Sequence, residues 1–159
     1  MPSSILHNND FQVLTRHAPN GMTLALSVSM VGTVSTKCRG RVLAIDDEPE
    51  LLEVVRNSLE PHGFEVHTAS SAREGVEYYE QNWRSINLVL LDFLMPDMTG
   101  DLVFECLKRS NPDVRTVLLT GCEDHVAERM FEEGLRGYIH KPFGLDEFVH
   151  QVAEAVDSV

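Results

Sequence analysis

The chain contains little cysteine, and its cysteines do not follow the spacing of a metal site or a disulfide framework. There are three cysteines, an odd number, and no two of them form a C-x-x-C pair: Cys38, Cys106 and Cys122. Small disulfide-stabilised domains and structural zinc sites use more cysteines at regular intervals. The histidines are also scattered without the spacing of zinc ligands. We therefore expect free thiols in a reducing compartment and no zinc site.

The chain also lacks a hydrophobic run that could span a membrane. The one candidate, residues 22–34 (MTLALSVSMVGTV), is shorter than the roughly 20 residues that a transmembrane helix needs. As a signal peptide it would have a poor basic region in front of it and no A-x-A cleavage site. A strand or a non-native leader explains it better, so the sequence predicts a cytoplasmic protein without membrane attachment.

Basic residues are too few and too dispersed for a nucleic-acid interface. Three basic residues and one acidic residue give residues 1–39 a charge of +2, so the total of −12 leaves −14 for residues 40–159. Phosphate backbones repel so acidic a surface, which argues against direct nucleic-acid binding. The partners of this region should be proteins or small cations.

The length fits one domain, because globular domains have roughly 100–200 residues. From Arg41 onward, short apolar runs alternate with helical patterns, which is typical of repeated βα units. The pattern predicts an α/β fold, a doubly wound five-stranded parallel sheet with helices on both faces. Strands are expected at 42–45, 64–69, 88–91, 114–119 and 137–139, and helices at 49–60, 71–82, 99–109, 123–133 and 145–157. Ser71 and Glu74 have capping-box spacing, and Gly63 and Gly134 are placed as helix stops.

Residues 1–39 differ from this domain, which we place at residues 40–159. They are rich in Ser, Thr and Asn, and only residues 24–31 alternate in the manner of a strand. We expect a leader or appendage that is disordered or forms one extra strand. The domain should fold and function without it.

Polar residues follow four of the expected strands. Asp46 and Asp47 follow the first strand, Asp92 the third, Thr120 the fourth and Lys141 the fifth. In parallel sheets, ligands bind at the carboxyl ends of the strands, so these side chains should share one crevice. Asp46, Asp47 and Thr120 could instead only cap helices. The complete set favours a functional site.

Three carboxylates in one crevice repel one another and need a cation. Mg²⁺ suits such oxygen ligands, and Lys141 adds a fixed positive charge. An ionised aspartate beside Mg²⁺ and lysine can attack a phosphoryl donor, and the Thr120 hydroxyl could then contact the phosphoryl group. The sequence has no GxxxxGK phosphate loop, so a bound nucleotide is not expected.

The motifs VLAIDDE, LLDFLMPDMTG, VLLTG and GYIHKPF resemble the receiver domain of two-component response regulators, over residues 41–157. The resemblance implies a flavodoxin-like sheet of order 2-1-3-4-5, the order found in the chemotaxis member of this family. It implies that Asp92 is the phosphoacceptor. Asp47, Asp92 and the backbone carbonyl of Leu94 would bind Mg²⁺ directly, and Asp46 would bind it through water.

The resemblance also implies a switch. Thr120 and Lys141 would hold the phosphoryl group, and Tyr138 would rotate inward behind Thr120. This would remodel the surface of the fourth helix, fifth strand and fifth helix, where a downstream protein would bind. The bond before Pro142 is a candidate cis peptide, because a sharp turn is needed to aim Lys141. In similar receivers, polar residues at the positions of Leu94 and Cys122 accompany rapid dephosphorylation, so this chain should lose the group slowly.

We therefore expect a signalling switch that takes a phosphoryl group from a sensor histidine kinase and catalyses only its own modification. The alternative within this class is a phosphorelay shuttle that passes the group to a histidine phosphotransfer protein. A haloacid-dehalogenase-type phosphatase needs a second aspartate where Leu94 stands, and an unphosphorylated scaffold should have lost pocket residues. No room for an output domain follows Val159, so the expected output is a protein interaction.

Overall fold

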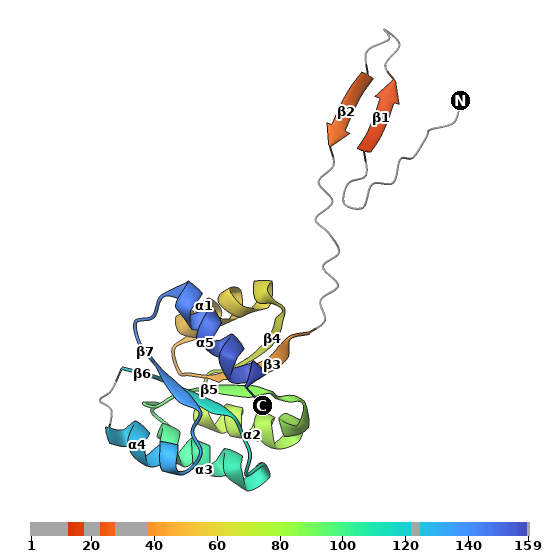
Figure 1. Ribbon diagram of the computed structural model, residues 1–159. Coiled ribbons are helices and arrows are strands. Elements are labelled where there is room, and N and C mark those ends of the chain that lie inside the picture. Colours follow the sequence, from red (N-terminus) through yellow and green to blue (C-terminus); the bar gives the residue numbers. More distant parts are fainter. Residues whose placement is uncertain (1–12, 18–22, 28–37, 122–124, 159) are drawn as a thin grey trace. The chain divides into compact units, whose positions relative to one another are not determined.

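The computed structural model describes residues 13–17, 23–27, 38–121 and 125–158 (Figure 1). The chain divides into two units, residues 1–36 and 37–159. In the first unit, β1 (Val13–His17) and β2 (Thr23–Ser27) form a two-stranded antiparallel sheet. The sequence predicted at most one strand here. A lone strand leaves its backbone N–H and C=O groups unpaired, and β1, which lacks a clear alternation, supplies the partners for β2.

The second unit contains five βα repeats, as predicted. Its parallel strands lie in the order β4-β3-β5-β6-β7, which is 2-1-3-4-5 when this unit's strands are numbered from its own start. The strands are β3 (Gly40–Ile45), β4 (Phe64–Ala69), β5 (Leu88–Asp92), β6 (Thr116–Thr120) and β7 (Gly137–His140). The helices are α1 (Pro49–Leu59), α2 (Ala72–Asn82), α3 (Gly100–Ser110), α4 (His125–Glu132) and α5 (Leu145–Asp157), with short 3₁₀ helices η1 (Glu60–His62) and η2 (Trp83–Ser85).

The helices cover both faces of this sheet, with α1 and α5 on one side and α2, α3 and α4 on the other (Figure 1). Successive residues of a strand point to opposite faces. Val42 and Ala44 of β3 accordingly pack in the core beneath α1 and α5, and Leu43 and Ile45 pack in the core beneath α2 and α3. Both faces are buried, which explains why the central strands are apolar without interruption.

The predicted boundaries differ from the structure at several ends. β6 begins at Thr116 and not at 114, because Val114 closes a turn by donating its backbone N–H to the Asn111 carbonyl. Val114 is nevertheless buried, so its apolar character reflects packing and not a strand. α1, α2 and α3 each differ from the prediction by one residue at one or both ends. The expected start of α4 at residue 123 lies outside the described residues.

The helix ends carry the predicted signals. Ser71 Oγ accepts the Glu74 backbone N–H at 3.2 Å at the start of α2. The Glu74 carboxylate returns to the backbone N–H of Ser70 and not to that of Ser71. Gly63 and Gly134 adopt φ angles of 88° and 104°, which favour glycine after a helix. Within the described ranges, each helix is too short or too polar to cross a bilayer.

Candidate functional site

The ends of four neighbouring strands bring the predicted polar residues to one edge of the sheet. Asp46 and Asp47 directly follow β3, and Asp92 is the last residue of β5. Thr120 is the last residue of β6, and Lys141 directly follows β7. Because all these strands are parallel, their carboxyl ends share this edge.

The three aspartates form one cluster of carboxylates. Asp46, Asp47 and Asp92 each offer an oxygen, and these oxygens lie within 4.8 Å of one another. Asp46 is 1% exposed and Asp92 is 7% exposed, whereas Asp47 faces solvent. The cluster therefore combines two buried carboxylates with one that solvent can reach.

The Lys141 ammonium lies between the two buried carboxylates. Its Nζ donates to Asp46 Oδ2 at 2.7 Å and to Asp92 Oδ1 at 2.7 Å. Its backbone N–H donates to the Thr120 carbonyl at 2.9 Å, which fixes the chain after β7 against the end of β6. The peptide bond between Lys141 and Pro142 is cis.

Burial and charge oppose each other in this crevice. Burial raises the pKa of the Asp92 carboxyl, and the hydrogen bond and the charge of Lys141 offset part of that rise. Burial alone would lower the pKa of the Lys141 ammonium, but its hydrogen bonds to Asp46 and Asp92 outweigh burial and raise that pKa. The lysine therefore stays charged and helps to keep Asp92 ionised.

The remaining oxygens of the buried aspartates accept backbone N–H groups. Asp46 Oδ1 accepts from Glu48 at 2.8 Å, just before α1, and Asp92 Oδ2 accepts from Leu94 at 2.9 Å. Asp46 thus fixes the turn that leads into α1 while its other oxygen binds Lys141. The structural and functional interpretations of this residue are compatible.

The carboxylate cluster has the size and chemistry that Mg²⁺ requires. Mg²⁺ binds oxygen at about 2.1 Å, so two direct ligands lie at most about 4.2 Å apart. A spread of 4.8 Å among three carboxylate oxygens suits two direct ligands and a third that acts through water. Hard oxygen ligands, with no sulfur or imidazole in the cluster, also match this cation.

The remaining predicted residues differ in burial and contacts. Thr120 is buried, and Leu94 has a side chain that is 60% exposed. Tyr138 is 38% exposed, and its ring makes edge contacts with His140 at 4.9 Å and with Phe131 of α4 at 5.9 Å between ring centres. Cys122 lies outside the described residues.

Sequence reasoning missed two residues that shape the loop after Asp92. Gly100 donates its N–H to the Phe93 carbonyl at 2.8 Å, and a Cβ there would lie 2.9 Å from the Asp92 carbonyl oxygen. Asp97 accepts two backbone N–H groups from the start of α2, and these hydrogen bonds, led by that from Arg73, lower the pKa of its carboxyl. A glycine at the start of an amphipathic helix was a readable signal for close packing. Nothing local in the sequence links Asp97 to α2.

Comparison with known proteins agrees with this geometry. The family model of the response regulator receiver domain matches residues 42–153. A response regulator receiver domain protein from Clostridium thermocellum has a TM-score of 0.70 and 32% identity, and the match covers 74% of this chain and 94% of that chain. A CheY-like receiver domain protein from Methanospirillum hungatei has a TM-score of 0.69 and 28% identity, with the same coverage of 74% and 94%.

The curated relatives are longer proteins. The probable transcriptional regulatory protein TcrX of Mycobacterium tuberculosis is 34% identical over 110 residues, which are 68% of this chain and 46% of that protein. The chain spans half or less of the length of the first curated relatives that it matches. The family model covers most of the chain, and its residues 42–153 include the carboxylate cluster. The chain belongs to the receiver domain family of two-component response regulators.

Proposed function

We propose that this protein is a phosphorylation-dependent signalling switch in which Asp92 takes a phosphoryl group from a phosphohistidine of a sensor kinase. The observation that carries the proposal is the cluster of Asp46, Asp47 and Asp92 with the Lys141 ammonium 2.7 Å from two of its carboxylates. This cluster lies at the carboxyl edge of the sheet in a receiver fold. The group added to Asp92 would then alter a protein-binding surface.

Asp92 is held for attack by its neighbours. The Leu94 N–H binds Oδ2 and Lys141 binds Oδ1, so the carboxylate has one fixed orientation. An Asp92 oxygen forms a bond to phosphorus while the bond from phosphorus to the donor's histidine nitrogen breaks. The electrons of that bond stay on the imidazole nitrogen, which takes up a proton. Because Lys141 keeps the Asp92 carboxylate ionised, no separate base is needed to remove a proton from it before this step.

Asp47, Asp92 and the Leu94 carbonyl would hold Mg²⁺ directly, and Asp46 would hold it through water. When bound, Mg²⁺ supplies positive charge to the incoming phosphoryl oxygens and lowers the repulsion among the carboxylates. The carboxylate of Asp47 suits this role, because it is exposed to solvent and so accessible to an arriving ion.

After transfer, Lys141 and Thr120 would both contact the phosphoryl group. The Lys141 side chain already contacts Asp92, and the Lys141 backbone is hydrogen-bonded to that of Thr120. A movement of Lys141 would therefore shift Thr120, and the reverse. The Tyr138 ring is partly exposed and contacts the rings of Phe131 and His140. An inward shift of Thr120 would let Tyr138 leave these contacts and change the surface of α4 and β7.

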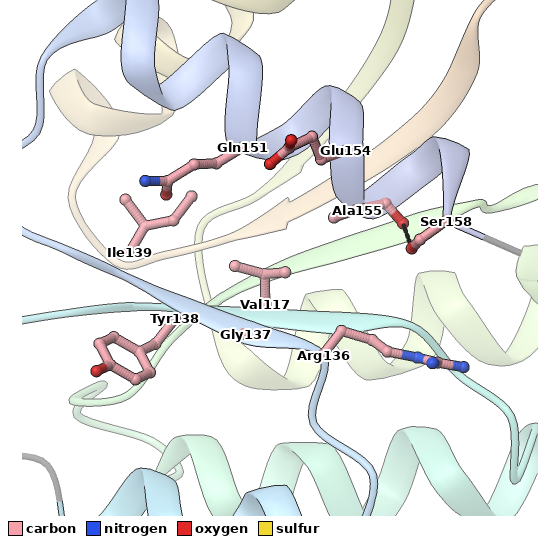
Figure 2. Close-up of a pocket in the computed structure, with 9 residues that line it drawn as sticks. All are labelled: Val117, Arg136, Gly137, Tyr138, Ile139, Gln151, Glu154, Ala155 and Ser158. Carbon is pink, nitrogen blue, oxygen red and sulfur yellow. Dashed lines mark hydrogen bonds between the residues drawn. The ribbon is translucent and has the colours of Figure 1, made fainter.

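The proposed output surface consists of α4, β7 and α5. Between β7 and α5 it contains a depression of about 410 Å³, and Figure 2 shows Ile139 and Val117 pointing toward α5 while Tyr138 points away from it. Gly137 leaves this depression open, since a Cβ there would meet only Val117 at 4.0 Å. Tyr138, the proposed switch residue, thus borders a depression that a partner's side chain could enter.

Acetyl phosphate with Mg²⁺ provides the direct test. The protein should gain one phosphoryl group, and the gain should disappear in Asp92→Asn and after removal of Mg²⁺ with EDTA. Labelling of Asp92→Asn to the parent level would contradict the proposal. A pull-down with and without a beryllofluoride mimic would then identify a partner that prefers the activated form.

The relay alternative differs only in the recipient of the phosphoryl group. A shuttle would transfer label from Asp92 to a histidine phosphotransfer protein within the lifetime of the phosphorylated form. A switch would keep its label while it binds a target. Incubation of the labelled protein with candidate phosphotransfer proteins separates these two outcomes.

A further inference from the structure

The loop between β5 and α3, residues 93–99, carries the one proposed metal ligand that is not a carboxylate, the Leu94 carbonyl. A backbone carbonyl cannot turn independently of the chain, so it binds an ion more tightly when the loop already holds it in place before the ion arrives. The contacts that fix this loop therefore bear on metal affinity.

Two of these contacts are local. Gly100 N–H bonds to the Phe93 carbonyl at 2.8 Å, and Leu94 N–H bonds to Asp92 Oδ2 at 2.9 Å. Both close the ends of the loop near β5. Met95 is 7% exposed and packs into the core beneath α2 and α3, whereas the Leu94 side chain faces solvent and cannot anchor its own residue.

A further contact, made by Asp97, reaches a distant part of the chain. Asp97 Oδ1 accepts the Ala72 backbone N–H at 3.2 Å, and Asp97 Oδ2 accepts the Arg73 backbone N–H at 3.0 Å. These N–H groups belong to the first turn of α2, where no intrahelical acceptor exists. A carboxylate is also favoured at this end of a helix by the helix dipole. The tip of the loop is thereby joined to a rigid helix.

We propose that Asp97 is a positioning residue for the metal site, which it serves by tying the loop that carries Leu94 to the start of α2. Leu94 lies between the bond at Asp92 and the bond at Asp97, so both ends of its segment are fixed. Without Asp97 the carbonyl would sample several orientations, and the ion would have to order it on binding. The inference rests on the proposed function, since it assumes that Leu94 is a metal ligand.

Ser71 supplies a matched control. Its Oγ accepts the Glu74 N–H at 3.2 Å and so caps the same turn of α2, but Ser71 has no bond to the loop. Replacing either residue removes caps from one helix, so both changes should lower the melting temperature. Only the change at Asp97 also releases the loop. A general loss of helix stability is thus separable from a specific effect on the metal site.

The test is Mg²⁺ affinity, measured by calorimetric titration of the full chain, for the parent, Asp97→Ala, Asp97→Asn and Ser71→Ala. Loss of a residue that orients a metal ligand typically weakens binding by about tenfold or more, so about tenfold is expected for Asp97→Ala. Asp97→Asn keeps one acceptor oxygen and should fall between the parent and Asp97→Ala. Ser71→Ala should bind Mg²⁺ as the parent does.

Hydrogen exchange of residues 93–100 without metal gives a second readout. Exchange should be faster in Asp97→Ala and unchanged in Ser71→Ala. Parent-like affinity and exchange in Asp97→Ala would overturn the proposal, as would equal weakening of Mg²⁺ binding in Ser71→Ala. A parent chain that bound no Mg²⁺ would overturn the proposed function as well. Failure at Asp97 with an intact parent site would overturn only the positioning role.

Discussion

Replacing Lys141 with methionine should strongly destabilise the metal-free protein. The change keeps an unbranched side chain that is one heavy atom shorter, and it removes the ammonium that binds Asp46 and Asp92 at 2.7 Å each. The side chains of Asp46, Asp92 and Lys141 are only 1%, 10% and 19% exposed, so water replaces the lost contacts poorly. Breaking a buried ion pair from one side typically costs about 3–5 kcal/mol. We expect the lower end, about 3 kcal/mol, because each carboxylate keeps one backbone N–H donor.

Urea unfolding in EDTA measures this cost. With a slope of about 1.5 kcal/mol per molar urea, a loss of about 3 kcal/mol lowers the midpoint by about 2 M. Added Mg²⁺ should restore much of this loss of unfolding free energy, since its proposed ligands are intact. A Mg²⁺ concentration of a hundred times the dissociation constant stabilises the folded protein by about 2.7 kcal/mol. Phosphorylation of Lys141→Met should no longer be coupled to partner binding.

Arg129→Met is the control for this experiment. Arg129 pairs with Asp101 at 3.1 Å on the surface, where its side chain is 63% exposed. Exposed pairs typically contribute less than about 1 kcal/mol. A loss below about 1 kcal/mol in Lys141→Met, or an equal loss in Arg129→Met, would refute the view that Lys141 holds the carboxylates together.

Three further predictions concern lifetime, packing and pH. Leu94→Asn combined with Cys122→Glu should shorten the lifetime of the phosphoryl group on Asp92 by a factor of about 5 to 30. The reason is that a contact which orients the attacking water lowers the barrier to hydrolysis by about 1–2 kcal/mol. Unchanged decay of label from the purified double mutant would contradict this. Thr116→Val should raise the melting temperature, because the buried Thr116 Oγ has no hydrogen-bond partner among the described residues, whereas Val117→Thr should lower it. Burial lowers the pKa of His67, whose ring stacks on that of a tyrosine. The unfolded chain therefore binds the proton more readily than the folded one, and the free energy of unfolding should fall as pH drops through and below about 6.5. His67→Gln should flatten that part of a plot of unfolding free energy against pH.

Residues at the strand ends were predictable from the sequence because their positions follow from local pattern and sheet topology. Asp92 follows an unbroken apolar run, and parallel strands place such residues at one edge. The same logic predicted Lys141 in the crevice, and the family resemblance supplied the order of the strands. The bond between Lys141 and Asp46, which are 95 positions apart, was not predicted, although the predicted crevice contained both residues.

Other features depend on three-dimensional contacts that no local pattern encodes. The bond from Asp97 to Arg73 spans 24 positions and arises from the conformation of an irregular loop. Val114 is buried like a strand residue but forms a turn, because tertiary packing and not pairing fixes its position. The pairing of β1 with β2 likewise required a second strand whose own pattern is weak.

The proposed switch depends most directly on which residue is phosphorylated. Borohydride reduces an aspartyl phosphate to homoserine, and peptide mass spectrometry can then locate the converted residue after treatment with acetyl phosphate and Mg²⁺. Homoserine is expected in place of Asp92 and of no other aspartate, and none should form when Mg²⁺ is removed. Conversion at Asp46 or Asp47, or a phosphoryl group that resists borohydride, would contradict this expectation.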